Sequence, residues 1–72
     1  MIYKVFITTD SGRIFYIDRS GSITGLFPKT FESRVEAEEY AKTQVRKTFP
    51  SYKIYVEEYV SPYARSNYQV NA

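Results

Sequence analysis

Residues 33–50, SRVEAEEYAKTQVRKTFP, decide the fold because they form the clearest helical pattern in the chain. Ser33 followed by Glu36 is a capping box, in which each side chain satisfies a free backbone N–H at the helix start. Glutamates gather near the beginning and lysine and arginine near the end, which complements the helix dipole. Pro50 ends the helix at or before the preceding residue. Small or apolar side chains recur along one helical face, at Ala37, Tyr40, Ala41, Val45 and Phe49.

The residues before this helix predict three strands. Residues 2–9 and 13–18 alternate with period two and are rich in β-branched and aromatic side chains. Ser11-Gly12 lies between them, and glycine supplies the positive φ that a tight hairpin needs. A second pair, Ser20-Gly21, precedes a third expected strand at residues 22–27, which Pro28 closes. The spacing therefore predicts a three-stranded antiparallel meander.

The hairpin register follows from the length of its loop. A two-residue loop places Thr8 opposite Phe15 and Phe6 opposite Ile17, whereas a three-residue loop exchanges the two faces of one strand. We prefer the two-residue loop because it separates the charged side chains from one apolar face of the hairpin better. It places Val5, Ile7, Ile14 and Tyr16 on one face, and Lys4, Phe6, Arg13, Phe15 and Ile17 on the other.

After the helix, residues 52–60 alternate again, with Ile54 and Val56 on one face and Lys53, Tyr55 and Tyr59 on the other. A right-handed crossover would place this strand parallel to the first strand. The predicted fold is a small α+β domain of order β-β-β-α-β, with the helix packed on one face of the sheet. The expected compact domain covers residues 1–60, and residues 61–72 form a polar, flexible tail.

The composition favours binding over catalysis. The chain has no histidine, cysteine or tryptophan, yet eight of its 72 residues are tyrosine. The commonest general base, the strongest nucleophile and the main soft-metal ligands are therefore missing. The sequence also contains no phosphate-binding loop, nucleophile elbow or EF-hand loop. We expect no enzyme activity, no metal and no cofactor.

One helix covers one face of a sheet, so the other face is expected to be open. An exposed aromatic patch rimmed by charge marks an interaction surface. We expect this face to dock on a larger protein, as an inhibitor or adaptor of a size that viruses and mobile elements encode. Aromatic side chains would anchor the contact and cations would orient it. The candidate contact residues are Lys4, Phe6, Arg13, Phe15, Lys53, Tyr55 and Tyr59. A homodimer through the same face, or the tail folded over it, is the alternative for a domain this small.

Nucleic-acid binding is the alternative function for the same face, with rings stacking on bases and cations contacting phosphates. Residues 17–21, IDRSG, and 31–38, FESRVEAE, resemble the turn and helix start of the arm-binding domains of tyrosine recombinases and of plant AP2 domains. Those families lay a three-stranded sheet in the DNA major groove, so the resemblance implies DNA binding through the sheet. The chain departs from that pattern in its strand after the helix and in its net charge of only +2, so no family is assigned.

Two other surfaces have ordinary interpretations. The outer helix face is typical of a solvated surface, with charges at i, i+4 spacing at Arg34, Glu38, Lys42 and Arg46. The tail offers an arm that orders on a partner, with Tyr63, Arg65 and Tyr68, although such an end is more commonly frayed. The amino terminus alternates like a strand rather than a signal peptide, and no apolar run reaches the roughly 18 residues that cross a bilayer. A cytoplasmic location without membrane contact is expected.

Overall fold

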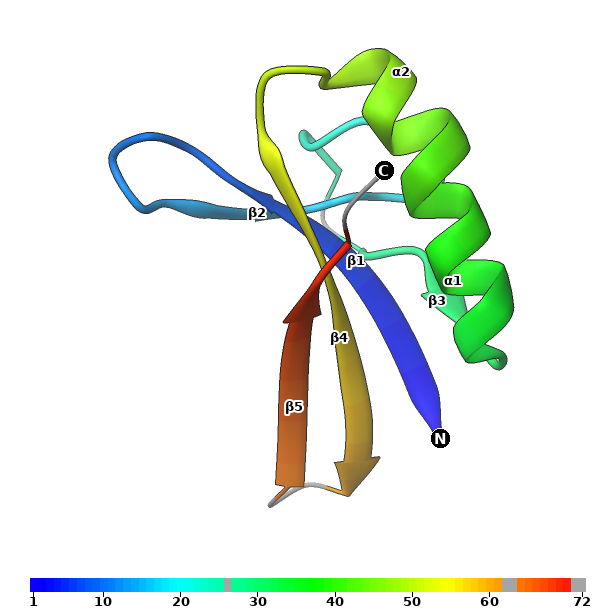
Figure 1. The fold of residues 1–72 in the computed structure, drawn as a ribbon. Helices are drawn as coiled ribbons and strands as arrows, with labels where there is room; N and C mark the ends of the chain where they lie inside the picture. The colour runs from blue at the N-terminus through cyan, green and yellow to red at the C-terminus, as the bar shows by residue number, and fades with distance from the viewer. Residues whose placement is uncertain (26, 62–63, 71–72) are drawn as a thin grey trace.

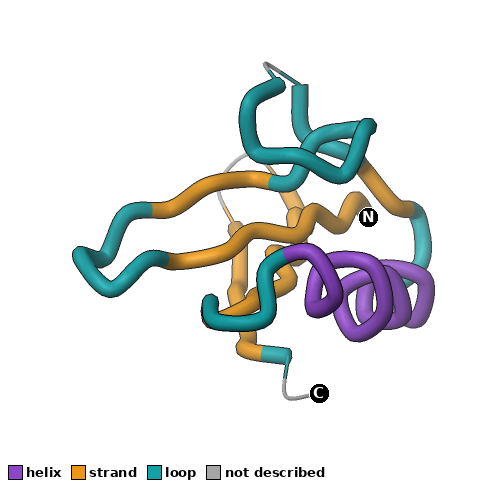
Figure 2. The backbone as a smooth tube through the Cα atoms, turned by 90° about the horizontal axis from the view of Figure 1, so that it is seen from above, coloured by secondary structure: helices purple, strands orange, loops and turns teal. Residues whose placement is uncertain are grey.

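The computed structural model describes residues 1–25, 27–61 and 64–70. An antiparallel sheet forms one layer and a single helical segment covers one of its faces (Figures 1 and 2). The predicted α+β class and the order β-β-β-α-β are confirmed, and a further strand follows. The elements are β1 Ile2–Thr8, β2 Ile14–Tyr16, β3 Thr30–Phe31, α1 Arg34–Tyr40, η1 Ala41–Val45, α2 Arg46–Thr48, β4 Lys53–Ser61 and β5 Ala64–Gln69.

The three helical pieces are continuous and match the predicted helix. The Ser33 hydroxyl accepts a hydrogen bond from the Glu36 backbone N–H at 3.4 Å, as the capping box predicts. The middle piece, η1, is a wider π-helical turn, in which the Arg46 N–H reaches the carbonyl of Ala41 five residues back. The side chains of Ala37, Ala41 and Val45 are buried against the sheet, so the predicted apolar face is the packed face.

The hairpin register differs by one residue from the predicted one. Thr8 pairs with Ile14 and Phe6 with Tyr16, so the loop has three residues between Thr9 and Arg13. Gly12 takes a φ of +86° at the end of this loop, which is the usual geometry of a three-residue hairpin with a bulge. The slip exchanges the two faces of β2, so the predicted positions of its side chains were wrong.

Of residues 22–27, expected as the third strand, the described ones, 22–25 and 27, form no strand; Leu26 lies outside the described residues. Around Asp18 the chain instead closes into a loop. One carboxylate oxygen accepts from the backbone N–H of Ser20 and Ser22, and the other accepts from the N–H of Gly25 at 2.7 Å. Gly21 turns the chain with a φ of +86°. These local bonds compete with strand pairing, because they satisfy the backbone donors that a ladder would use.

Because the third strand pairs with β1 and not with β2, β4 runs in the opposite direction to the predicted one. A strand paired to β2 would have run parallel to β1, whereas β3 pairs with β1 in the antiparallel sense, at Tyr3–Phe31 and Lys4–Thr30. The helix therefore runs in the same sense as β1, and β4 returns antiparallel to it (Figure 1). The predicted neighbour of β1 was correct and the predicted parallel direction was wrong.

The expected tail is part of the sheet where the structure describes it. β5 pairs with β4 in the antiparallel sense, with Glu57 opposite Asn67 and Tyr59 opposite Arg65. Val70 follows β5, donates its N–H to the Ile54 carbonyl at 2.8 Å and is buried. The boundary at residue 60 is therefore corrected: the ordered domain includes residues 64–70, while residues 62–63 and 71–72 lie outside the described part.

The core lies between the helix and one face of the sheet. Val5, Ile7, Ile54 and Val56 point into it, as predicted. The hairpin slip brings Ile17 and Phe15 to this face and removes two residues expected there. Ile14 is 54% exposed, and Tyr16 lies on the opposite side of the sheet.

Candidate binding face

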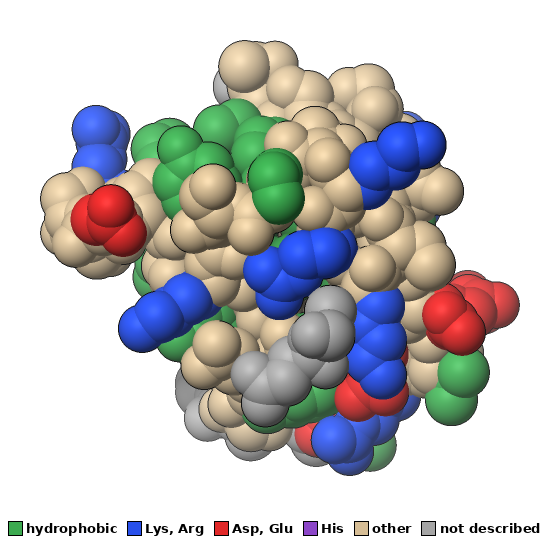
Figure 3. All heavy atoms as spheres, turned by 45° about the horizontal axis from the view of Figure 1, so that its top comes forward, with side chains coloured by type: hydrophobic (Ala, Val, Ile, Leu, Met, Phe, Trp, Pro, Cys, Tyr) green, Lys and Arg blue, Asp and Glu red, His purple; other side chains and the backbone are tan. Residues whose placement is uncertain are grey.

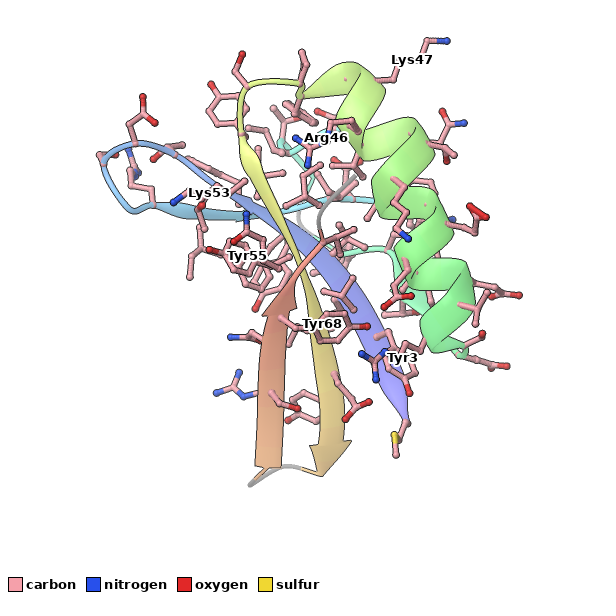
Figure 4. All side chains as sticks on the ribbon, in the orientation of Figure 1. Tyr3, Arg46, Lys47, Lys53, Tyr55 and Tyr68 are labelled. Atoms are coloured by element: carbon pink, nitrogen blue, oxygen red, sulfur yellow. The ribbon has the colours of Figure 1, made fainter. Side chains whose placement is uncertain are left out.

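The strand side chains that point away from the helix form a second, uncovered surface, here called the open face. Cross-strand pairing arranges them in rows. The first row contains Tyr16, Phe6, Tyr55 and Gln69; the next contains Lys4, Glu57 and Asn67; the third contains Ile2, Tyr59 and Arg65. Figure 4 shows Lys53 and Tyr55 on the side of β4 away from the helix, and Tyr3 and Tyr68 on the helix side.

The first row is a cluster of three aromatic rings. The Phe6 ring stacks on Tyr55, with centroids 5.1 Å apart and planes 8° apart, and it meets Tyr16 at 5.5 Å. Phe6 is only 4% exposed because the two tyrosines cover it. Phe6 was predicted as an anchor for a partner. The structure places it beneath the anchors, where it supports Tyr16 and Tyr55.

Two other predicted contact residues lie on the opposite face. Phe15 packs against the core, and the Arg13 guanidinium sits 5.5 Å from the Phe15 ring centroid. Both were assigned to the open face by the two-residue loop, and the observed three-residue loop removes them. Tyr16 takes their place, and the alternative register considered from the sequence would have found it.

A buried carboxylate lies in the second row. Glu57 is 4% exposed and accepts a hydrogen bond from the Tyr16 hydroxyl. Burial, together with this bond to Glu57, raises the pKa of Tyr16 to about 12. The bond fixes the direction of the tyrosine ring, and burial leaves little of the carboxylate in direct reach of a partner.

Cations flank the remaining rings. The Lys4 ammonium lies 5.6 Å from the Tyr59 ring centroid and 6.0 Å from that of Tyr16. The Arg65 guanidinium lies 5.9 Å from the same Tyr59 ring. Such contacts orient long side chains on aromatic surfaces and keep their charge available to a partner. Arg65 was predicted only as part of a tail, although the alternation of Arg65, Asn67 and Gln69 with Tyr68 and Val70 is a strand signal.

The open face continues into a cleft of about 470 Å³ between the β1–β2 loop and the start of β4, lined by Thr8, Thr9, Asp10, Gly12, Ser51, Lys53 and Tyr55. Its polar lining adds hydrogen-bonding groups next to the aromatic row. Figure 3, which views this end of the molecule, shows lysine and arginine side chains spread over the surface, with acidic side chains at the left edge, at the right edge and below the centre.

Two of the charged side chains on the outer helix face, Arg34 and Arg46, contact other parts of the domain. Arg34 pairs with Glu38 at 3.4 Å, as expected, and its guanidinium lies 4.3 Å from the Tyr68 ring centroid. Arg46 turns towards the start of β4 and donates to the Tyr52 carbonyl at 3.3 Å, whereas Lys47 points away from the molecule (Figure 4). These contacts give Arg34 and Arg46 structural roles.

Within residues 1–25, 27–61 and 64–70, no group of three or more acidic, histidine or cysteine side chains is placed to hold a metal ion. In the same part of the chain, no helix has the length and apolar character needed to span a membrane.

Comparisons of the chain with protein-family models, with curated proteins and with solved structures found no match.

Proposed function

We propose that this domain is a non-catalytic binding protein that docks the open face on an acidic surface of a larger protein. The contact residues are Lys4, Tyr16, Lys53, Tyr55, Tyr59 and Arg65. Four of the seven residues selected from the sequence remain in this set. Because the chain lacks cysteine, we place the interaction in the reducing environment of the cytoplasm.

The charge of the open face carries this proposal. The described strand residues that point away from the helix include three cations, at Lys4, Lys53 and Arg65, against a single carboxylate. That carboxylate, Glu57, is buried and bonded to Tyr16. Tyrosines with one apolar flank and one polar tip are enriched at protein interfaces, and cations around them favour a complementary acidic surface.

The same rings bear on nucleic-acid binding, the alternative function. A stacking platform needs ring faces that are free to contact bases. Here Phe6 covers one face of the Tyr55 ring, and Lys4 and Arg65 both lie close to the Tyr59 ring, so fewer ring faces are free for bases. The geometry therefore favours a protein partner, and nucleic acid becomes an outcome to test.

Charge-reversal pairs test the open face directly. Lys53→Glu with Arg65→Glu changes two exposed cations on the face, and Lys42→Glu with Lys47→Glu changes two exposed cations on the helix. Each pair moves the net charge from +2 to −2, so the bulk charge is matched. Proteins captured from a host lysate by the wild-type domain should be lost with the first pair and retained with the second. Equal capture by both pairs would contradict the proposal.

A fluorescent single-stranded oligonucleotide, titrated at two salt concentrations, tests the alternative. With three cations engaged, affinity would fall with a log–log salt slope of about −2. We expect no specific binding; tight, salt-sensitive binding that the Lys53→Glu, Arg65→Glu pair abolishes would replace the protein partner with a nucleic acid.

A further inference from the structure

β5 lies at an edge of the sheet, as Figure 1 shows, and among the described residues no strand pairs with its outer side. The opposite edge is covered differently. There, two short strands, β2 of three residues and β3 of two, lie along β1. β5 has six residues, so it offers the longest free edge of the sheet.

The direction of its backbone groups follows from one hydrogen bond. Val70 donates its N–H to the Ile54 carbonyl, and residues of an antiparallel strand alternate between facing the partner strand and facing away. Counting back two residues at a time from Val70, the N–H and C=O groups of Tyr68 and Ser66 also face β4. The N–H and C=O groups of Arg65, Asn67 and Gln69 point outward, where they are free to pair with another strand.

This edge lacks most of the features that prevent unwanted pairing. Exposed edges are usually blunted by proline, by several charges, by bulges or by short length. The segment Ala64–Gln69 contains no proline or glycine, and its single charge is Arg65. The one irregularity in its pairing lies at the start, between Tyr59 and Ser61.

The outward-facing residues also belong to the open face. The side chains of Arg65, Asn67 and Gln69 lie beside Tyr59, Glu57 and Tyr55 respectively. An added strand would therefore lengthen each row of the open face by one residue, with its alternate side chains next to Arg65, Asn67 and Gln69.

We propose that the outer edge of β5 accepts an extended, acidic segment of the partner protein as an additional β-strand. This inference rests on the proposed function and specifies how the partner is held. Main-chain hydrogen bonds to Arg65, Asn67 and Gln69 provide the attachment, and carboxylates opposite Arg65 provide the selection. A second copy of the chain is the less suitable occupant, because its own β5 carries an arginine and no carboxylate.

Synthetic peptides of about ten residues, long enough to span β5, provide the probe. One alternates glutamate with valine and threonine, and its counterpart has lysine in place of glutamate. Amide hydrogen exchange, read residue by residue by NMR, should slow at least tenfold at Asn67 and Gln69 on saturation with the glutamate peptide. Ser66 and Tyr68, which already face β4, should change little. The lysine peptide should give no protection.

Asn67→Pro and Asn67→Ala form a matched pair, because only the proline removes the outward N–H. The proline variant should lose the glutamate peptide while Ser66 and Tyr68 keep their protection, and the alanine variant should bind it. Arg65→Glu, which keeps the backbone intact, should reverse the preference to the lysine peptide. No protection of β5 at millimolar peptide, protection elsewhere only, or equal binding by both Asn67 variants would overturn the inference. So would a doubled molar mass with β5 protected in the absence of peptide.

The capture assay separates this inference from the proposed function. If the Lys53→Glu, Arg65→Glu pair loses the partner and Asn67→Pro retains it, the open face is correct and the β5 edge is wrong. If Lys53→Glu alone and Asn67→Pro both lose the partner while Asn67→Ala keeps it, both proposals are supported, because Lys53 lies in β4, outside the β5 edge. If neither loses it, both fail.

Discussion

Truncating Phe6 should remove a large share of the stability of this domain. Its ring is 4% exposed and contacts Tyr16 and Tyr55 on the face opposite the main core. Removing a buried phenylalanine ring costs about 3–5 kcal/mol. A chain of 72 residues, at roughly 0.05–0.15 kcal/mol per residue, has about 4–11 kcal/mol in total. Phe6→Ala is therefore expected to leave the domain marginally folded or unfolded.

Urea unfolding followed by far-ultraviolet circular dichroism measures this loss, because the chain has no tryptophan to report by fluorescence. Phe6→Leu, which keeps most of the apolar volume, should cost about 1.5 kcal/mol or less. Ile14→Ala is the control on the same face; its side chain is 54% exposed, so a change of only about 0.5 kcal/mol is expected.

The same experiment tests the hairpin register. A double-mutant cycle between Phe6 and Tyr16 should give a coupling of about 0.5–1.5 kcal/mol, because the two rings touch. With a two-residue loop they would lie on opposite faces, and the coupling would vanish. A cost below about 1 kcal/mol for Phe6→Ala, or no coupling, would refute the role of Phe6 as the support of the open face.

Gly25→Ala should destabilise the domain more than Gly12→Ala. A Cβ at Gly25 would meet the Asp18 carboxylate oxygen at 2.5 Å, whereas one at Gly12 meets nothing within 4 Å and costs only the roughly 1–2 kcal/mol of its positive φ. Equal urea midpoints for the two variants would contradict this. The hydrogen bond from the Ser20 hydroxyl holds the pKa of Asp18 below its usual 3.8, so its stabilising contribution is present above that pH and lost as the pH falls through the lowered pKa. Thermal melts in acid should therefore show a weaker pH dependence for Asp18→Asn than for the wild type, and parallel curves would count against the Asp18 loop. The pKa of Tyr16, about 12 in the folded protein against 10.0 for a free side chain, makes its contribution complete below pH 10 and lost as the pH rises towards 12. Melts in alkali should show a shallower loss for Tyr16→Phe. The late-titrating part of the tyrosinate absorbance should be smaller in this variant, with the remainder from Tyr3 and Tyr68, whose pKa values burial also raises.

The helix and the long strands could be predicted from the sequence because their signals are local. The capping box at Ser33 and the stop at Pro50 fix the ends of the helix, and period-two alternation identifies β1 and β4. Their core faces follow from the same alternation, since Ile54 and Val56 are buried as predicted.

The hairpin loop could not be settled in the same way. Ser11-Gly12 fits a two-residue loop and also the end of a three-residue loop, where Gly12 takes the positive φ. Both registers bury apolar side chains, since either Phe15 and Ile17 or Ile14 and Tyr16 can face the helix. Packing in the folded domain, which a local pattern does not contain, decides between them.

The prediction of a third strand at residues 22–27 was wrong for a related reason. Residues 22–27 have the composition of a strand, but Asp18 collects the backbone donors of Ser20, Ser22 and Gly25. A carboxylate followed by serine and glycine at these positions is a loop signal, and only the Ser20-Gly21 turn was used. Two errors changed the candidate site: Phe15 and Arg13 were assigned to it through the wrong hairpin register, and Arg65 was left in a tail that forms β5.

Cysteine footprinting of the complex tests the open face most directly, because the chain contains no cysteine to interfere. Single cysteines replace Lys53 and Asn67 on the open face, and Glu39 and Lys47 on the helix. Maleimide labelling is then compared with and without the captured partner. The account predicts that the partner slows labelling at positions 53 and 67 and leaves positions 39 and 47 unchanged. Protection of the helix positions, with the sheet positions still reactive, would contradict it.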